Sequence, residues 1–268
     1  MAMDLASIIS TPPSGRRTAV IIDHQRYAQA VILRGQRIPW GDAVAYSGFF
    51  GQAQGLLKSD ATLLDLGALY DFFLASEDRL KDAMSARSRI GYSLKILLGD
   101  RATAEKTLEF ATVLAQTSRP PLVLQIPAPA LWLARTHQLA GAGSRQQLDV
   151  DHAERAAMYV ADWLRNLSAL PVSLLLLDAR PGDEADLPTV DLAGYTPVSN
   201  ITDHYRWALG QRTDEGVTLA EASTTGVAVP PSYWLSTDAD PPVGDYLIAD
   251  IPADAVPETV LAQLARLS

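Results

Sequence analysis

Short apolar runs alternate with amphipathic segments along the whole chain of 268 residues, and this alternation is the feature that most limits its fold. Apolar residues on successive positions are typical of strands that are covered on both faces. The clear runs are residues 18–23, 61–66, 122–126, 172–177, 226–229 and 246–250. Two weaker strand candidates are residues 91–97, whose apolar spacing suits a helix equally well, and residues 195–199.

Apolar residues spaced three and four apart predict amphipathic helices between these runs. The predicted helices are residues 49–58, 77–87, 103–116, 129–139, 151–167, 203–212 and 257–267. Acidic, proline-bearing segments over residues 180–189 and 237–244 are typical of surface loops.

Strands that alternate with helices favour parallel pairing with right-handed crossovers. We therefore predict a parallel (β/α)8 barrel-like single domain over residues 1–268, since such a barrel typically needs roughly 250 residues. Residues 1–17 are expected to be a flexible or loosely packed lead-in. The alternative is an open doubly wound parallel sheet. That alternative lacks its usual glycine fingerprint, because the first strand leads into Asp23-His-Gln-Arg26 instead of G-x-G-x-x-G.

Charge and composition limit the partners. The formal net charge of −9, with no basic stripe to offset it, argues against nucleic acid and anionic membrane surfaces. No apolar stretch approaches the ~20 residues that a membrane span needs, and the N-terminus lacks a signal-peptide pattern. We expect a cytoplasmic protein that binds a small molecule, and a homodimer is the oligomer to expect first, because it is the commonest one.

The chain contains no cysteine, which excludes disulfides, thiolate metal sites and a cysteine nucleophile. None of the four histidines is spaced as H-x-x-x-H, and neither a P-loop nor a G-x-S-x-G nucleophile elbow is present. We therefore expect neither a metal nor a cofactor.

In a parallel α/β fold, ligands bind at the carboxyl ends of the strands. That rule selects Asp23, His24, Arg26, Asp65, Gly67, Gln125, Asp178, Arg180, Asn200, Asp203, His204, Pro230, Tyr233, Trp234 and Asp250. Asp178 is the most informative, because it ends an apolar strand where an unpaired carboxylate costs several kcal/mol. Either it pairs with Arg180 or caps the next loop, or it is a general base or a substrate-binding carboxylate.

Asp23 and His24 are the other catalytic candidates, as an acid–base pair, although neighbouring residues on a strand point to opposite faces. We expect Arg26, Asp65, Gln125 and Arg180 to bind substrate, an arginine clamping an anionic group. Asn200 and His204 are further binding candidates, or else simply belong to a helix start. Tyr233 and Trp234 offer aromatic area for stacking a ligand, or pack in the core.

Two segments carry a resemblance to a known family. Pro120–Leu133 is a strand that passes through a proline-broken turn into a helix, and Pro171–Asp178 is an apolar strand with an acidic end. Both resemble segments in the barrels of the cobalamin-independent methionine synthase and uroporphyrinogen decarboxylase superfamily. The synthase branch binds zinc through His and Cys, which this cysteine-free chain cannot reproduce. The decarboxylase branch needs no metal and uses Arg and Asp in its barrel mouth, roles that the resemblance would give to Arg26 and Asp65.

The preferred hypothesis is a metal-independent lyase or group-transfer enzyme that acts on a small polar organic molecule. Asp178 would be its acid or base, and Arg26 or Arg180 would hold an anionic group of the substrate. The alternative is a non-catalytic barrel that binds a metabolite or a partner protein. A cofactor-dependent oxidoreductase on an open sheet is a third possibility.

Overall fold

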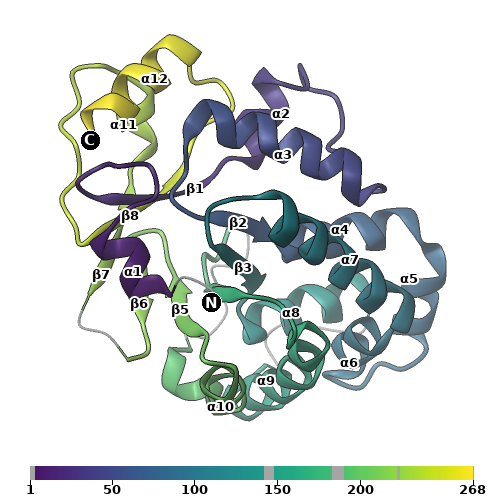
Figure 1. The fold of residues 1–268 in the computed structure, drawn as a ribbon. Coiled ribbons are helices and arrows are strands. Elements are labelled where there is room, and N and C mark those ends of the chain that lie inside the picture. Colours follow the sequence, from purple (N-terminus) through teal and green to yellow (C-terminus); the bar gives the residue numbers. More distant parts are fainter. Residues whose placement is uncertain (1–3, 142–147, 183–189, 222–223, 268) are drawn as a thin grey trace.

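The computed structural model describes residues 4–141, 148–182, 190–221 and 224–267, and these form a nearly closed α/β barrel (Figure 1). The strands of this part of the chain are β1 (Ala19–Asp23), β2 (Thr62–Asp65), β3 (Leu122–Pro127), β4 (Val172–Asp178), β5 (Ala208–Arg212), β6 (Gly216–Leu219), β7 (Thr225–Val229) and β8 (Tyr246–Asp250). Their order in the sheet is β1-β8-β7-β6-β5-β4-β3-β2. From β2 to β8 each strand pairs with its neighbours in sequence, and β1 pairs with β8. All pairs are parallel except those of β6, which runs antiparallel to both β5 and β7.

The six clear strand predictions are confirmed, and the two weaker ones are wrong. Residues 91–97 fall in helix α6 (Tyr92–Gly99), the alternative that their spacing allowed, and residues 195–199 lie in a short 3-10 turn and helix α10 (Thr196–Tyr205). The hairpin β5–β6 takes their place in the barrel. The predicted helix 203–212 is wrong beyond Tyr205, because Arg206 adopts a left-handed conformation that ends α10 before β5 begins.

The barrel closes between β1 and β2 through two polar side chains. The Val20 N–H donates to Asp60 Oδ2 at 2.9 Å, and the Ile22 N–H donates to Ser59 Oγ at 3.0 Å. The Asp60 N–H returns a hydrogen bond to the Val20 carbonyl at 2.9 Å. Asp60 is fully buried and forms an ion pair with Arg16. The side chains of Ser59 and Asp60 thus supply the acceptors that a paired strand backbone would otherwise offer.

Helix α1 (Leu5–Ser10) closes the end of the barrel at which the parallel strands begin. Its Leu5 and Ile8 are buried among the apolar side chains of the barrel interior, including Ile21 and Tyr246. The sequence suggested a flexible or loosely packed lead-in over residues 1–17. Residues 5–10 instead form a helix that packs into the barrel. Asp4 caps the helix by accepting from the Ser7 N–H at 2.8 Å.

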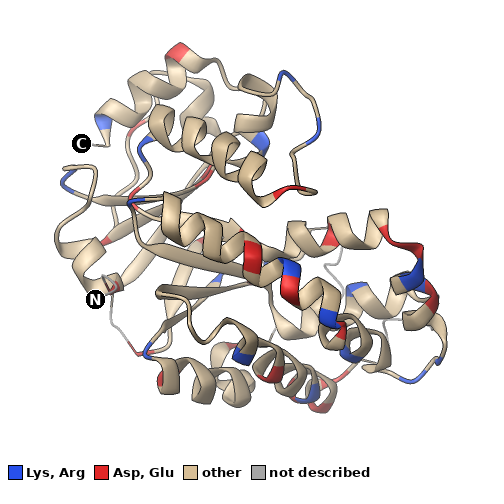
Figure 2. Cartoon of the chain, turned by 45° about the vertical axis from the view of Figure 1, so that its right-hand side comes forward, with Lys and Arg blue, Asp and Glu red and all other residues tan. Residues whose placement is uncertain are grey.

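Helices cover the outside of the barrel. Besides α6 and α10, they are α2 (Gln25–Val31), α3 (Ala43–Leu57), α4 (Leu66–Ser76), α5 (Asp78–Ser85), α7 (Arg101–Thr117), α8 (Pro129–Leu139), α9 (Val150–Leu164), α11 (Pro231–Leu235) and α12 (Pro257–Arg266). In the view of Figure 2, Lys and Arg are interspersed with Asp and Glu over these helices and do not gather into one basic area. Among the described residues, no helix combines the length and apolar character that crossing a bilayer requires.

Candidate functional site

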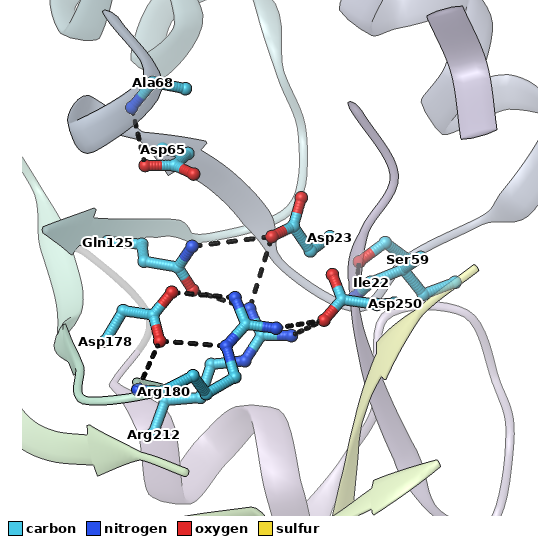
Figure 3. A network of polar contacts seen from close by, with 10 residues as sticks. All are labelled: Ile22, Asp23, Ser59, Asp65, Ala68, Gln125, Asp178, Arg180, Arg212 and Asp250. Carbon is cyan, nitrogen blue, oxygen red and sulfur yellow. Dashed lines mark hydrogen bonds and ion pairs between the residues drawn. The ribbon is translucent and has the colours of Figure 1, made fainter. Parts of the chain in front are cut away.

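Polar side chains from six strands meet at the mouth of the barrel, the end at which the parallel strands finish. The strand register sets Asp23 of β1 beside Asp250 of β8, and Asp65 of β2 beside Gln125 of β3. It also sets Asp178 of β4 beside Arg212 of β5. Residues at matched register in a closed barrel share one level, so these side chains point toward one another (Figure 3).

Arg212 is the centre of this network. Its side chain is only 3% exposed, and it donates through Nη1 to Gln125 Oε1 at 2.6 Å and to Asp23 Oδ2 at 3.3 Å. Its Nη2 donates to Asp250 Oδ2 at 2.5 Å. Gln125 in turn donates to Asp23 Oδ2 at 3.4 Å. A buried guanidinium requires partners of this kind, because an unpaired charge at that depth would be strongly destabilising.

Arg180, on the loop after β4, is the second guanidinium. Its Nε and Nη2 donate to the two oxygens of Asp178 at 2.9 and 2.7 Å, and its Nη1 donates to Asp250 Oδ2. The Arg180 N–H also donates to Asp178 Oδ1 at 3.1 Å. The fork of Arg180 is thereby held rigidly by Asp178, with one donor directed at Asp250 (Figure 3).

Asp65 differs from the other carboxylates because no Lys or Arg in the described part of the chain forms an ion pair with it. Its Oδ1 accepts from the Ala68 N–H at 3.1 Å, which makes Asp65 the N-cap of α4. Burial and the negative charge of Asp23 raise the pKa of Asp65 to about 7. Burial would also raise the pKa of Asp23, but the charges of Arg212 and Arg180 outweigh it and the pKa is lowered. The mouth therefore holds one ionised carboxylate beside one that exchanges its proton near neutral pH.

His24 and Tyr46 form an aromatic wall beside these two carboxylates. The His24 ring packs on Phe50 with 4.5 Å between ring centroids, and neither ring nitrogen has a hydrogen-bond partner among the described residues. Burial lowers the pKa of His24 to about 4, against the opposing charge of Asp23, so the ring is neutral. Burial and the charges of Asp65 and Asp23 raise the pKa of the Tyr46 hydroxyl, which therefore keeps its proton.

Five of the predicted catalytic and substrate-binding residues form no hydrogen bond or ion pair with this network in the described part of the chain. Arg26 is exposed on the first turn of α2. Asn200 and His204 are exposed on α10 and line a groove between α9 and α10 on the outside of the barrel. Tyr233 and Trp234 are fully buried between α11 and α12.

Two physical reasons account for most of these differences from the prediction. Residues 195–199 are not a strand, so Asn200 and His204 follow no strand end. Tyr233 belongs to the core, because its hydroxyl donates to the Gln263 carbonyl at 2.8 Å and Gln263 Nε2 donates back to the Tyr233 carbonyl. The remaining predicted residues, Asp23, His24, Asp65, Gln125, Asp178 and Arg180, do come together at the mouth, with Asp250.

Two residues of the mouth, Arg212 and Tyr46, are not among the residues predicted from the sequence. Arg212 was hidden at the end of a predicted helix, although a signal was present. Thr213-Asp-Glu-Gly216 is a turn-forming stretch between two short apolar runs, the pattern of a hairpin. Tyr46 lies near the start of α3 among other buried apolar residues, where no local pattern separates a site residue from a core residue.

No family model, curated protein or solved structure matches this chain. The site must therefore be interpreted from its geometry. In the described ranges, no cluster of three or more His, Asp or Glu side chains has the arrangement that would hold a metal ion. The arrangement offers two guanidiniums that can bind an anion, an ionised carboxylate, and a carboxyl group that can give or take a proton.

Proposed function

We propose that the barrel mouth is the active site of a metal-independent lyase or group-transfer enzyme that acts on a small polar organic molecule. The observation that carries the proposal is Asp65, a carboxyl with a pKa of about 7 at the end of a barrel strand and close to the ionised Asp23. A general acid or base is most effective when its pKa lies near the working pH. Paired carboxylates with separated pKa values are typical of acid–base sites.

The side chains divide into roles on this proposal. Asp65 gives or takes the proton, and Arg180 and Arg212 hold an anionic group of the substrate. Asp178, our first choice for the acid or base, instead fixes the fork of Arg180, since both its oxygens accept from that guanidinium. Burial and the charge of Asp23 together hold the pKa of Asp65 near neutral pH.

The resemblance of Pro120–Leu133 and Pro171–Asp178 to the methionine synthase and uroporphyrinogen decarboxylase superfamily supports a barrel of this kind. Its metal-free branch uses Arg and Asp at the same end of the barrel. Asp65 fits the acidic role, whereas Arg180 and Arg212 are better placed than Arg26 for the basic one.

Proton transfer to carbon gives a test that needs no known substrate. The protein is incubated in D2O with a panel of small carboxylic acids and keto acids, and loss of substrate C–H signals is followed by proton NMR. We expect exchange or turnover with the wild type, a decrease of about 10²–10⁴-fold in Asp65→Asn, and no effect of a chelator. Asp42→Asn is the matched control, because Asp42 also caps a helix, α3, away from the network. A full rate in Asp65→Asn would remove Asp65 from the mechanism.

One observation favours the alternative of a non-catalytic barrel that binds a metabolite. The arginines are already paired with carboxylates of the chain itself, as expected of a structural network. In that case small acids would bind at the mouth, but neither exchange nor turnover would follow in any variant.

A further inference from the structure

A single carboxylate oxygen joins the two arginines of the mouth. Asp250 Oδ2 accepts from Arg212 Nη2 and from Arg180 Nη1. Its Oδ1 accepts no hydrogen bond from the described residues. The other partners of the arginines are used differently, since Asp178 gives both oxygens to Arg180 alone. Asp250 is thus the one carboxylate in this network that both guanidiniums share.

Asp250 is more exposed to solvent than the two arginines that it joins. Its side chain is 45% exposed, whereas that of Arg180 is 26% exposed and that of Arg212 is 3% exposed. Asp23 and Asp178, at 11% and 20%, are more deeply set. An anion that arrives from solvent therefore meets Asp250 before it meets the guanidiniums.

We propose that Asp250 is an exchangeable internal counter-ion, and that the carboxylate of a small carboxylic acid takes its place on Arg180 and Arg212. This inference rests on the proposed function, in which these two arginines hold an anionic group. The group now bound there is itself a carboxylate, so its replacement by another carboxylate preserves both geometry and charge. A phosphate dianion would bring a second negative charge close to Asp23 and Asp178, which is unfavourable.

The exchange links ligand binding to a proton. The charged groups that face Asp250 are Asp23 from β1, Arg212 from β5 and Arg180 from the loop after β4, with Asp178 behind Arg180. Burial and the charge of Asp23 already raise the pKa of Asp250 to about 6, although the arginines oppose them. An Asp250 carboxylate that loses the arginines to an incoming anion has only negative neighbours, so it takes up a proton. The affinity for a carboxylic acid should therefore rise as the pH falls from 8 to 6.

The test is calorimetric titration of the whole protein with propionate, and separately with inorganic phosphate, at pH 6, 7 and 8. Titrations at pH 7.5 in two buffers of different ionisation enthalpy count the protons taken up. We expect the wild type to bind propionate with net proton uptake and several-fold more tightly at pH 6 than at pH 8. Asp250→Asn should bind at least tenfold more tightly at pH 8, with a smaller pH dependence and less proton uptake than the wild type, because only Asp65 then titrates at the mouth. Asp254→Asn makes the same change of charge at an exposed position four residues away and should match the wild type.

The outcomes separate this inference from the proposed function. Equal affinity and equal pH dependence in the wild type and Asp250→Asn would overturn the exchange but leave Asp65 as the acid or base. Phosphate binding more tightly than propionate, or no propionate binding to either protein, would overturn it too. If Asp250→Asn does not fold, the wild type decides, because binding without proton uptake at pH 7.5 contradicts the exchange. The proposed function is tested separately, by the deuterium-exchange experiment with Asp65→Asn.

Discussion

Replacing Asp65 by Asn should stabilise the protein above pH 7 while it removes the group that we assign to proton transfer. The pKa of Asp65 is raised from 3.8 to about 7 by burial and by the charge of Asp23. A raised carboxyl pKa means that the folded state holds the ionised form less well than the unfolded state does. The contribution of Asp65 to the free energy of unfolding is therefore fully present below about pH 4 and is lost as the pH rises through 7.

The magnitude follows from the size of that difference. Each unit of difference between the folded-state and unfolded-state pKa corresponds to ~1.4 kcal/mol of unfolding free energy. The difference of about three units for Asp65 therefore corresponds to about 4 kcal/mol at pH 8. Because the Asp65 side chain retains some contact with solvent, we expect Asp65→Asn to recover about 2 kcal/mol of this. The amide oxygen of Asn can still accept from the Ala68 N–H, so the cap on α4 is kept.

Urea denaturation at pH 5, 6.5 and 8 measures the effect. The free energy of unfolding of the variant should exceed that of the wild type by an amount that grows with pH and levels off above pH 7. Asp42→Asn is the control, because Asp42 caps α3 through the Val44 and Ala45 N–H groups without a neighbouring carboxylate in the network. A variant that is no more stable than the wild type at pH 8 would refute the raised pKa, and with it the basis of the proposed acid or base.

Three further substitutions test other parts of the barrel. Arg212→Met should destabilise the protein by about 3–5 kcal/mol in urea, because it leaves buried polar partners unpaired, and a loss below 1 kcal/mol would contradict the central role of Arg212. Asp60→Asn should cost about 1–3 kcal/mol, since it weakens the seam between β1 and β2; an unchanged thermal midpoint would show that the seam does not need the carboxylate. His24→Phe removes a base whose pKa is lowered to about 4, and such a base costs stability as the pH falls from 6.5 toward 4. The variant should therefore gain about 2 kcal/mol on the wild type by pH 4.5, and parallel acid denaturation curves would refute this.

The strand predictions worked where the strand is buried on both faces. Residues 172–177 form β4 in full, because a run of Leu side chains covered by helices outside and by the barrel core inside has no polar alternative. Residues 208–212 and 216–219 were missed because β5 and β6 are short and form an antiparallel hairpin, whose pattern differs from that of the buried parallel strands. One misassigned segment, residues 203–212, accounts for the loss of Arg212 from the predicted site.

By itself the sequence determined that Asp23, Asp65, Gln125, Asp178 and Asp250 lie at or near the carboxyl ends of strands, because burial periodicity and strand ends are local properties of the chain. The rule that ligands bind at those ends then selected a level of the barrel, although not the partners within it. Only the tertiary structure decided that Arg212 enters the mouth and that Asp178 pairs with Arg180. It also decided that Asp65 forms no ion pair with a Lys or Arg of the described residues. Partner choice and pKa depend on distances across the barrel between residues up to 189 positions apart in the sequence, and no local pattern contains those distances.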